Sequence, residues 1–289
     1  MRKTNTLVCM SSFAPQHVTI FGVGLLGGSI GLAVRRAFPQ VTVVGVGRRQ
    51  VSLDTALRVG AIHTGNLSAD GVEQSDLIIL ATPVGVFESF LRDIKPRLKP
   101  GCLVTDVGST KAEVVVMAEA ILGAGGPFVG SHPMAGKEVT GPEHAEADLL
   151  DGALCLVTPT ESTPEELTAR AEWFWQSLSM RTARMSPSSH DQAVAQISHL
   201  PHLLSVLLME QPDDSSLPLA SSGFADMTRL AGGDISMWKD IVATNASPIV
   251  ESLRGLASRV EELADQIESQ NTSDIVQLLE SAKSRREHR

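Results

Sequence analysis

The sequence has no tyrosine and only three cysteines among its 289 residues. Cys9, Cys102 and Cys155 are odd in number and widely spaced, so they form neither a disulfide framework nor a CxxC metal motif. We interpret them as small core residues of a protein that is kept in a reducing compartment. The sequence offers no physical reason for the absence of tyrosine.

Long apolar runs and clustered basic residues are also missing. No stretch approaches the roughly 20 apolar residues that a membrane span needs, and the apolar run near the start is too short for a signal peptide. The net charge of -9 argues against a nucleic acid or an anionic membrane as partner. The short basic stretch at 283–289 is interpreted as a solvated tail. We therefore expect a cytoplasmic protein whose partner is a small molecule.

The N-terminal part alternates short apolar runs with helical patterns, and 43% of the chain is hydrophobic. Several runs are continuous and β-branched, which is typical of strands buried on both faces. We expect strands at 17–21, 41–46, 77–81, 102–105, 129–130 and 153–158, and helices at 29–36, 86–94, 111–122 and 164–177. This order predicts an α/β Rossmann-type domain with a doubly wound parallel sheet over residues 1–185.

The C-terminal part, 186–289, has helical periodicity and no strand signals. Ser186 followed by Pro187 is a typical helix start. We expect one helix at 190–209 with a kink at Pro201, a second at 247–269, a break near 271–273 and a last helix at 273–284. The apolar faces favour an all-helical substrate and dimerisation domain that forms a homodimer, although the same faces are compatible with an internal core.

A glycine-rich loop after the first expected strand matches G-x-G-x-x-G. Gly22 permits a tight turn and Gly24 lets a pyrophosphate approach the backbone. Gly27, helped by Gly28, lets helix and strand pack closely. The strand before the loop and the helix after it favour a dinucleotide site over a plain turn. The residues expected to contact the cofactor are Gly22, Gly24, Leu25, Leu26, Gly27, Arg48, Arg49, Thr82 and Pro83.

The end of the second expected strand bears on the choice of nicotinamide cofactor. NAD enzymes usually carry an acidic residue there, which binds the ribose hydroxyls. This chain has Gly47 at that position, followed by Arg48 and Arg49. An arginine can bind a 2′-phosphate bidentately, so we expect NADP, with NAD less favoured. The alternative is that the two arginines are merely solvated in a loop.

Four further segments carry candidate chemistry: 106–111 (DVGSTK), 131–136 (SHPMAG), 190–202 (HDQAVAQISHLPH) and 224–241 (FADMTRLA to MWKDI). The first two are expected to follow strands, where open α/β sheets place their ligands. With the glycine loop, these ordered motifs resemble the prephenate and arogenate dehydrogenases, from about residue 17 to beyond 245. The resemblance implies a Rossmann-type domain, a helical dimerisation domain and oxidative decarboxylation of a cyclohexadienol in tyrosine biosynthesis.

The resemblance assigns the catalytic roles to His132 and Ser109. His132 would accept the proton of the ring hydroxyl while hydride leaves that carbon, a task that suits a neutral imidazole near pH 7. Without the resemblance, a histidine before a proline in a loop is more often structural. Ser109 would hydrogen-bond the reacting hydroxyl and position His132, and it is also a candidate helix N-cap. Lys111 is expected near the cofactor or the domain junction, without a chemical role.

The resemblance also implies that Arg229 binds a substrate carboxylate, for which a guanidinium offers bidentate geometry. We expect it in a loop, with Trp238 packed nearby, and the alternative is a surface ion pair with Asp226. Glu138 is a weaker candidate for the rim of the site.

Helical spacing groups three more candidates for substrate binding. On an ideal helix Asp191, Ser198 and His202 lie within about 40° of one another, whereas His199 lies about 80° away. We expect His202 to touch the substrate side chain and Asp191 to lie near the entrance, with His199 as a core histidine bonded to backbone. A metal held by His199 and His202 needs further ligands that the sequence does not place, so we expect none.

The two candidate substrates leave conflicting signs. A histidine at the position of His202 favours prephenate, whereas the missing acid at Gly47 resembles NADP-using arogenate enzymes. We expect conversion of prephenate to 4-hydroxyphenylpyruvate with NADP, with arogenate or dual use as the alternative. Two rivals are a different Rossmann-plus-helices reductase, such as a β-hydroxyacid dehydrogenase or pyrroline-carboxylate reductase, and a non-catalytic NADP-binding sensor. The sequence leaves no room for an appended regulatory domain, so any feedback by tyrosine is expected at the active site.

Overall fold

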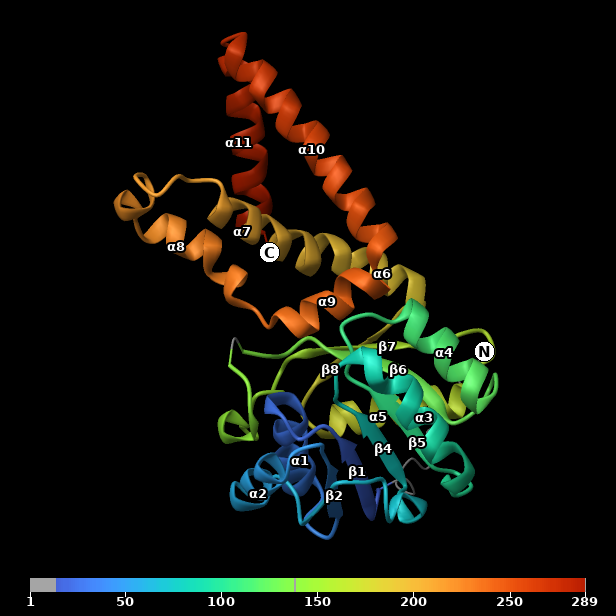
Figure 1. The fold of residues 1–289 in the computed structure, drawn as a ribbon. Coiled ribbons are helices and arrows are strands. Elements are labelled where there is room, and N and C mark those ends of the chain that lie inside the picture. The colour runs from blue at the N-terminus through green and yellow to red at the C-terminus, as the bar shows by residue number, and fades with distance from the viewer. Residues whose placement is uncertain (1–13, 138, 289) are drawn as a thin grey trace.

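An eight-stranded sheet forms the centre of the N-terminal half of the computed structural model, which describes residues 14–137 and 139–288 (Figure 1). The strand order is β3-β2-β1-β4-β5-β6-β7-β8. The strands are β1 (His17–Phe21), β2 (Thr42–Val46), β3 (Thr64–Asn66), β4 (Leu77–Leu80), β5 (Leu103–Asp106), β6 (Phe128–Pro133), β7 (Leu154–Thr158) and β8 (Arg181–Arg184). The order reverses between β1 and β4, so a crevice for a ligand opens at the carboxyl ends of these two strands.

The first six strands are parallel and the seventh is not. β7 runs antiparallel to β6, whereas β8 is again parallel to β7. The cause lies in the connection from β6 to β7, which contains the 3-10 turn η5 (Pro142–His144) but no helix that crosses the sheet. Parallel neighbours need such a crossover. The predicted Rossmann-type fold is confirmed, with this antiparallel strand as the departure from the expected parallel sheet.

Helices cover both faces of the sheet. They are α1 (Leu25–Ala37), α2 (Gln50–Arg58), α3 (Phe87–Ile94), α4 (Ala112–Leu122) and α5 (Glu165–Ser177), with 3-10 turns η2 (Val72–Gln74), η3 (Val84–Val86) and η4 (Lys95–Arg97). One buried cluster contains side chains of α1, α2 and α5, and a second contains side chains of α3 and α4. The apolar strand residues alternate between the two clusters, which explains why the strands read as continuous apolar runs.

The chain after β8 is helical. It comprises α6 (Pro187–Val194), the π-helical segment η6 (Ala195–His199), α7 (Leu200–Glu210), η7 (Leu217–Leu219), α8 (Ser222–Thr228), η8 (Arg229–Gly232), α9 (Ile235–Thr244), α10 (Ala246–Glu268) and α11 (Thr272–Glu287). Ser186 caps α6 by accepting the N–H of Ser189, as its position before Pro187 predicts. The expected long helix is continuous, but its irregular part is the π segment before Pro201 and not a kink at the proline.

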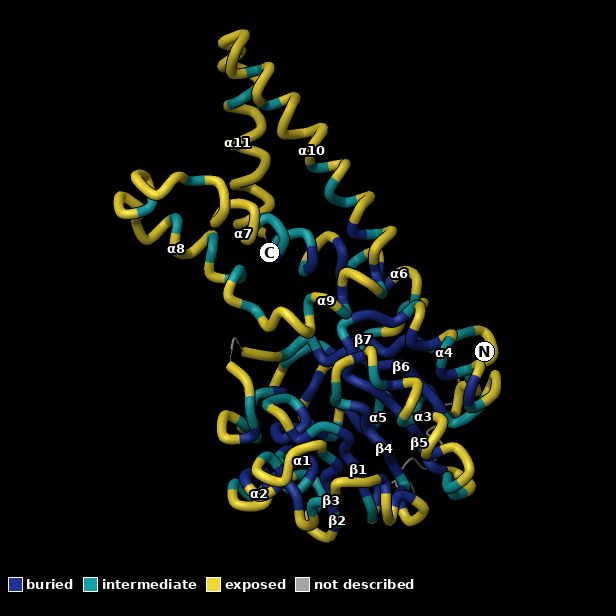
Figure 2. The backbone as a smooth tube through the Cα atoms, viewed as in Figure 1, coloured by how far each residue is buried: buried dark blue, intermediate teal, exposed yellow. Residues whose placement is uncertain are grey.

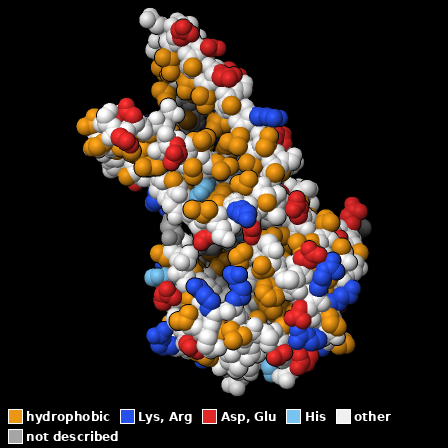
Figure 3. Space-filling view, viewed as in Figure 1, with side chains coloured by type: hydrophobic (Ala, Val, Ile, Leu, Met, Phe, Trp, Pro, Cys, Tyr) orange, Lys and Arg blue, Asp and Glu red, His pale blue; other side chains and the backbone are white. Residues whose placement is uncertain are grey.

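The last two helices project away from the sheet as a hairpin (Figure 1). Most of α10 and α11 is exposed (Figure 2). Among the described residues of α10, Ile249 near its start is the buried one. Apolar side chains follow this hairpin and α7 along the face shown in Figure 3. The exposed large apolar residues of α7, α10 and α11 include Val206, Leu207, Val260, Ile267, Val276 and Leu279.

Within the described part of the chain, no helix combines the length and the apolar character that crossing a membrane demands.

Candidate functional site

A cavity of about 720 Å³ lies where the sheet order reverses. Its walls come from the loops after β1, β2 and β4, from α2 and from the segment before η5. Six of the predicted cofactor residues line it, namely Gly22, Gly24, Arg48, Arg49, Thr82 and Pro83. Leu25 and Leu26 begin α1 immediately beside it. The residues predicted from separate parts of the sequence are therefore brought together at one crevice.

The glycine loop has the geometry that the motif requires. Gly22 has a φ of 93°, and a Cβ on Gly27 would lie 1.9 Å from the carbonyl oxygen of Gly22. At Gly24 a Cβ would meet nothing within 4 Å, so the space next to the start of α1 is open. The role expected for Gly28 is wrong, because its neighbour is Ala145 after η5 and not the strand.

Two features of this cavity fit a dinucleotide. The open space at Gly24 lies at the N-terminus of α1, where backbone N–H groups and the helix dipole favour a phosphate. The hydroxyl of Thr82 is buried and has no hydrogen-bond partner among the described residues. A buried hydroxyl is normally bonded, so this side chain fits a partner supplied by a ligand.

The end of the cavity next to β2 is cationic. Arg48 and Arg49 line it as expected, and α2 adds Ser52, Thr55 and Arg58. Arg58 donates to the hydroxyl of Thr55 at 2.7 Å. Glu143 lines the same cavity from η5, so one carboxylate shares the cavity with these arginines although the position after β2 is Gly47.

His132 lies at the carboxyl end of β6, next to the strand's antiparallel partner β7. The expectation that it sits in a loop is wrong, because β6 continues through Pro133 as the edge between the parallel and antiparallel parts of the sheet. Asp106, at the end of β5, accepts the N–H of Ser131 at 3.0 Å and thereby replaces a backbone carbonyl where the two strands diverge. The buried ammonium of Lys111 bonds the same carboxylate at 2.5 Å.

His132 is the first member of a buried hydrogen-bonded chain. Its Nδ1 lies 2.9 Å from Nε2 of His190, and Nδ1 of His190 lies 2.7 Å from Oδ1 of Asp191. Burial holds the pKa of His132 well below its ordinary value, and the neighbouring His190, Lys111 and His199 lower it further. Burial also lowers the pKa of His190, although the hydrogen bond to Asp191 opposes this shift. Both histidines are therefore neutral near pH 7.

The predicted position of Asp191 at the entrance of the site is wrong. Asp191 is 2% exposed, and its carboxylate accepts the N–H groups of Lys111 and Ala112, each at 2.8 Å. It thus caps α4 from the other domain, where the helix dipole favours a negative charge. Ser109 does not have the alternative role of N-cap, since α4 begins at Ala112. Ser109 is half-buried in the loop before this helix, and Lys111 lies at the domain junction, one of its two expected places.

The π segment changes which side chains share a face. It adds the equivalent of one residue to the helix, which rotates everything after it by roughly 100°. His199 consequently lies on the buried side with Asp191, and both are bonded by the Nδ2 group of Asn245. Ser198 lies within the π segment and is only half-buried, whereas Asp191 is buried, so the alignment predicted from a regular helix is wrong. Burial lowers the pKa of His199 to about 4.

His202 is buried against an aromatic ring. Its imidazole stacks on the indole of Trp238, and His199 meets the same indole edge-on. Gly233 lies at the edge of this stack, since a Cβ there would lie 2.7 Å from Cε1 of His202 and 2.9 Å from Nε1 of Trp238. Trp238 thus contacts these two histidines and packs against the cluster formed by Ala195, Ile241 and Ile249. The predicted packing of Trp238 near Arg229 stays a prediction.

Arg229 is exposed and lies at the junction of α8 and η8, so the predicted loop is a helix that ends in a 3-10 turn. Glu138, the expected rim residue, lies outside the described residues.

Helix α9 connects the helical half to the loops of the sheet. Asp240 accepts the N–H of Gly85 at 3.0 Å, within the 3-10 turn that follows Thr82 and Pro83. Thr244 shares a hydrogen bond of 2.8 Å with Thr110. These contacts join α9 to the loops after β4 and β5, and the bond between His132 and His190 joins β6 to α6 at the same domain junction.

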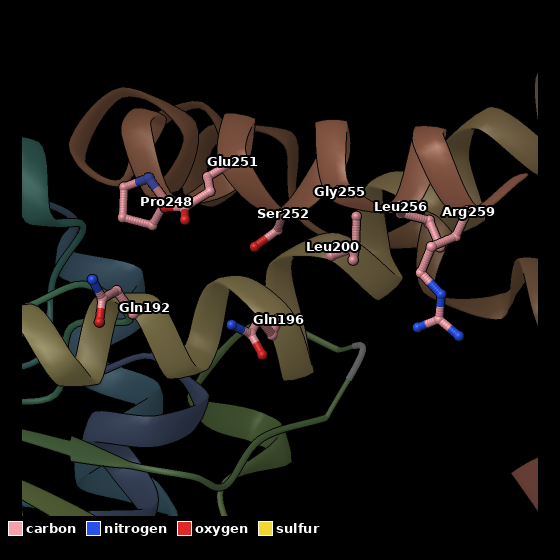
Figure 4. A pocket seen from close by; sticks show the side chains of 9 residues that line it. All are labelled: Gln192, Gln196, Leu200, Pro248, Glu251, Ser252, Gly255, Leu256 and Arg259. Atoms are coloured by element: carbon pink, nitrogen blue, oxygen red, sulfur yellow. The ribbon is translucent and has the colours of Figure 1, made fainter. Parts of the chain in front are cut away.

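A second hollow of about 590 Å³ lies between α6 and α10. Figure 4 shows Gln192, Gln196, Ser252 and Arg259 among its lining side chains. It opens on the outer side of the helix that carries His190 and Asp191. The described residues contain no group of three or more metal-binding side chains there or elsewhere.

Comparison with known proteins identifies the family. Residues 30–183 match the model "Prephenate dehydrogenase, nucleotide-binding domain", and residues 186–281 match "Prephenate dehydrogenase, dimerization domain". The chain belongs to the prephenate dehydrogenase family. It is therefore an oxidoreductase with a binding domain for a nicotinamide cofactor.

Three relatives illustrate the similarity. Prephenate dehydrogenase of Lactococcus lactis subsp. cremoris is 31% identical over 93% of this chain and 76% of the relative. The structure of prephenate dehydrogenase from A. aeolicus with hydroxyphenyl propionate and NAD+ has a TM-score of 0.88 at 30% identity, covering 94% of this chain and 97% of that chain. The structure of Synechocystis arogenate dehydrogenase has a TM-score of 0.81 at 29% identity, covering 94% of this chain and 99% of that chain.

Sequence reasoning missed His190 and Asp106. The first two letters of HDQAVAQISHLPH gave the signal for His190, because a histidine directly before an acid on a helix can be oriented by it. Asp106 heads the DVGSTK motif at a strand end, a position where a carboxylate can bond the backbone of the next strand. Neither signal identifies the partner atom without the fold.

Proposed function

We propose that this protein catalyses the NADP-dependent oxidative decarboxylation of prephenate to 4-hydroxyphenylpyruvate. The observation that carries the proposal is the buried His132, whose Nδ1 is bonded by His190 so that Nε2 is the nitrogen available to a substrate. A neutral imidazole next to the cofactor cavity suits the removal of a hydroxyl proton. Family membership and the nicotinamide-binding domain support the same reaction.

In the proposed reaction His132 takes the proton of the ring 4-hydroxyl at Nε2. A bound nicotinamide would supply the acceptor for the hydride of the same carbon. The ring carboxylate leaves as carbon dioxide, its bonding electrons complete the aromatic ring, and the phenolate oxygen regains a proton to form the 4-hydroxyl of the product. Burial of His132 serves this chemistry twice, because it keeps the imidazole neutral and excludes water from the reacting carbon.

We propose the following binding roles for the side chains of the site. Arg229 binds a substrate carboxylate, His202 on its Trp238 support touches the side chain, and Ser109 bonds the reacting hydroxyl. Arg48 and Arg49, with Arg58 beside them, bind the 2′-phosphate of NADP. Glu143 in the same cavity is the feature that favours NAD instead. Ser198, which does not share the buried face of Asp191, and Asp191, which is buried as a cap, are not proposed as substrate ligands.

Arogenate is the second candidate substrate. The observation that favours it is the similarity to Synechocystis arogenate dehydrogenase, together with Gly47 in place of an acid after β2. Arogenate carries an ammonium where prephenate has a keto group, so a neutral imidazole at His202 remains able to accept a hydrogen bond from it.

We also infer a homodimer formed by the helical half. The match to the dimerization domain and the exposed apolar side chains of α10 and α11 support it. Sedimentation at several concentrations tests this: a single monomeric species at micromolar concentration contradicts it. A cytoplasmic location remains a prediction.

Four assays test the reaction: prephenate and arogenate, each with NAD and with NADP, followed by the absorbance of the reduced cofactor. Turnover of prephenate with NADP supports the proposal. A preference for arogenate would replace prephenate as the proposed substrate, and a preference for NAD would replace NADP as the proposed cofactor. No turnover in any assay rejects the enzymatic proposal and favours the non-catalytic sensor.

A further inference from the structure

The hydrogen bonds around His190 have a direction, and Asp191 sets it. The Asp191 carboxylate accepts one backbone N–H on each of its two oxygens at the start of α4. Both oxygens are thus acceptors, and a carboxylate that accepts through both oxygens has no hydrogen to donate to His190. Nδ1 of His190, 2.7 Å away, therefore carries a hydrogen and donates it to Asp191.

The same reasoning continues to His132. A neutral imidazole carries one N–H, so a His190 that is protonated at Nδ1 has a lone pair on Nε2. His132 Nδ1 lies 2.9 Å from that lone pair and must be the donor. The lone pair of His132 is then on Nε2, which is the form that can act as a base.

We propose that His190 and Asp191 are positioning residues for the dehydrogenation: they hold His132 in the tautomer protonated at Nδ1, and His190 accepts the proton that His132 passes on. The identity of the reaction in this inference rests on the proposed function. The tautomer of His132 does not, because it is a property of the protein without substrate.

The proton transfer balances at each atom. The bond between the substrate oxygen and its hydrogen breaks as His132 Nε2 gains that hydrogen. The hydrogen on His132 Nδ1 moves to Nε2 of His190. His132 is then neutral with its hydrogen on Nε2, and His190 is a cation hydrogen-bonded to the Asp191 anion. Transfer of the Nε2 hydrogen of His132 to the phenolate oxygen of the product, and return of the proton from His190 to His132 Nδ1, restore the starting state.

The charges around the pair favour His190 over His132 as the resting place of the proton. His132 faces His190 from α6, Lys111 from the loop before α4 and His199 from η6, and each of these lowers its pKa. His190 faces Lys111, which lowers its pKa, but also Asp191 and Asp106, which raise it. The two carboxylates therefore stabilise a positive charge on His190, whereas no carboxylate does so for His132.

The tautomer can be measured directly. In full-length protein labelled with nitrogen-15 in histidine, a proton–nitrogen correlation at pH 7.5, assigned with His132→Gln, reports which nitrogen of each ring is protonated. We expect Nδ1–H on both His132 and His190. A His132 protonated at Nε2 overturns the proposal.

Asp191→Leu removes the acceptor for His190 Nδ1. Without that acceptor neither tautomer of His190 is held, so the hydrogen of His132 is distributed over both of its ring nitrogens. We expect kcat to fall roughly 10-fold or more, and the nitrogen-15 spectrum should show Nε2–H as well as Nδ1–H in His132. Asp234→Leu is the matched control, since Asp234 caps α9 through Met237 and should leave the His132 tautomer unchanged. An unchanged tautomer in Asp191→Leu contradicts the proposal.

His190→Gln separates the two proposed roles of His190, which are to fix the tautomer of His132 and to accept its proton. The glutamine oxygen can still accept from His132 Nδ1, but it cannot take the proton. We expect the His132 tautomer to persist, kcat to fall roughly 10-fold or more, and KM to change less than about twofold. In wild type, protonation of His190 makes it a donor to His132 and abolishes the base, so the acid limb of kcat should move to lower pH in His190→Gln. An unmoved acid limb with wild-type kcat overturns the relay.

Failure of the proposed function has a different signature. If wild type shows no turnover with either substrate while the Nδ1–H tautomer is present, the reaction is wrong and the hydrogen-bond chain stands. If wild type turns over while His132 is protonated at Nε2, the reaction stands and this inference is wrong.

Discussion

The imidazole of His202 lies flat on the indole of Trp238, with ring centroids 3.5 Å apart and planes inclined by 13°. The stack fixes the ring of a side chain that we propose to touch the substrate. It also removes the ring from water, and burial lowers the pKa of His202. The neutral, fixed ring offers one donor and one acceptor to a ligand.

Replacement of Trp238 tests the importance of this stack. An aromatic pair is worth about 0.5–1.5 kcal/mol beyond its buried area. Trp238→Ala should therefore raise the KM for the substrate roughly 2- to 10-fold through loss of His202 orientation. Trp238→Phe keeps a stacking partner, so its KM should lie between those of wild type and Trp238→Ala. Equal KM values for wild type and Trp238→Ala contradict the supporting role.

Arg229 is expected to hold a substrate carboxylate. A hydrogen bond to a charged group contributes about 1.5–3 kcal/mol, so Arg229→Ala should raise KM roughly 10- to 150-fold. Arg229→Lys keeps the charge but loses the bidentate geometry and should recover only part of this. Steady-state kinetics give the answer, with the Kd of the cofactor as the control that should not move.

The two glycines of the loop should fail differently. Gly27→Ala places a Cβ against the carbonyl of Gly22 and should lower Tm, whereas Gly24→Ala meets open space. Gly24→Ala should therefore keep Tm and weaken cofactor binding, because its methyl group occupies the expected phosphate position. Calorimetry and cofactor titration on both variants separate the effects. Equal Tm losses would mean that Gly24 is also required for folding.

Arg48 should decide the preference for NADP over NAD. Arg48→Ala removes a charge-assisted contact to the 2′-phosphate, which should lower kcat/KM for NADP roughly 10- to 100-fold. The value for NAD should change little, since NAD has no such phosphate. Glu143→Gln is a useful companion, because loss of its charge should favour NADP. A parallel loss for both cofactors in Arg48→Ala places this side chain elsewhere in binding.

Stability should fall on acidification because of His199. Its pKa is about 4 in the folded protein against an ordinary value of 6.5, so the unfolded chain binds more protons between these values. The stabilisation is present above pH 6.5 and is lost as pH falls toward 4, by about 2 kcal/mol at pH 5. Urea unfolding of wild type and His199→Gln at pH 7 and pH 5 tests this. The variant should lose less stability than wild type between the two pH values.

The fold was predictable where local pattern and global architecture agree. The continuous apolar runs, the glycine loop and the Ser186-Pro187 helix start all depend on neighbouring residues, and each appears where expected. The direction of β7 was not predictable, because it depends on whether residues 134–153 build a crossover helix. Those residues contain Pro142 and several glycines, but the packing of η5 against α1 decides the result.

The site was predictable as a set of residue types and less so as geometry. The helical calculation for residues 191–202 assumed a regular helix, and η6 invalidated it. The capping of α4 by Asp191 joins residues about 80 positions apart, and no local signal indicates such a contact. The partner of His132 could not be assigned for the same reason.

The π segment gives one helix two registers. Before it, His190 and Asp191 reach the proton side of His132, and after it, His199 and His202 reach Trp238. A regular helix of this length cannot present both pairs to one buried surface. Deletion of Gln196 or Ile197 would restore uniform pitch and rotate everything downstream about the helix axis, while His190, Asp191, His199 and His202 all remain in the chain. Such a variant would keep these side chains and lose the arrangement that lets them act together.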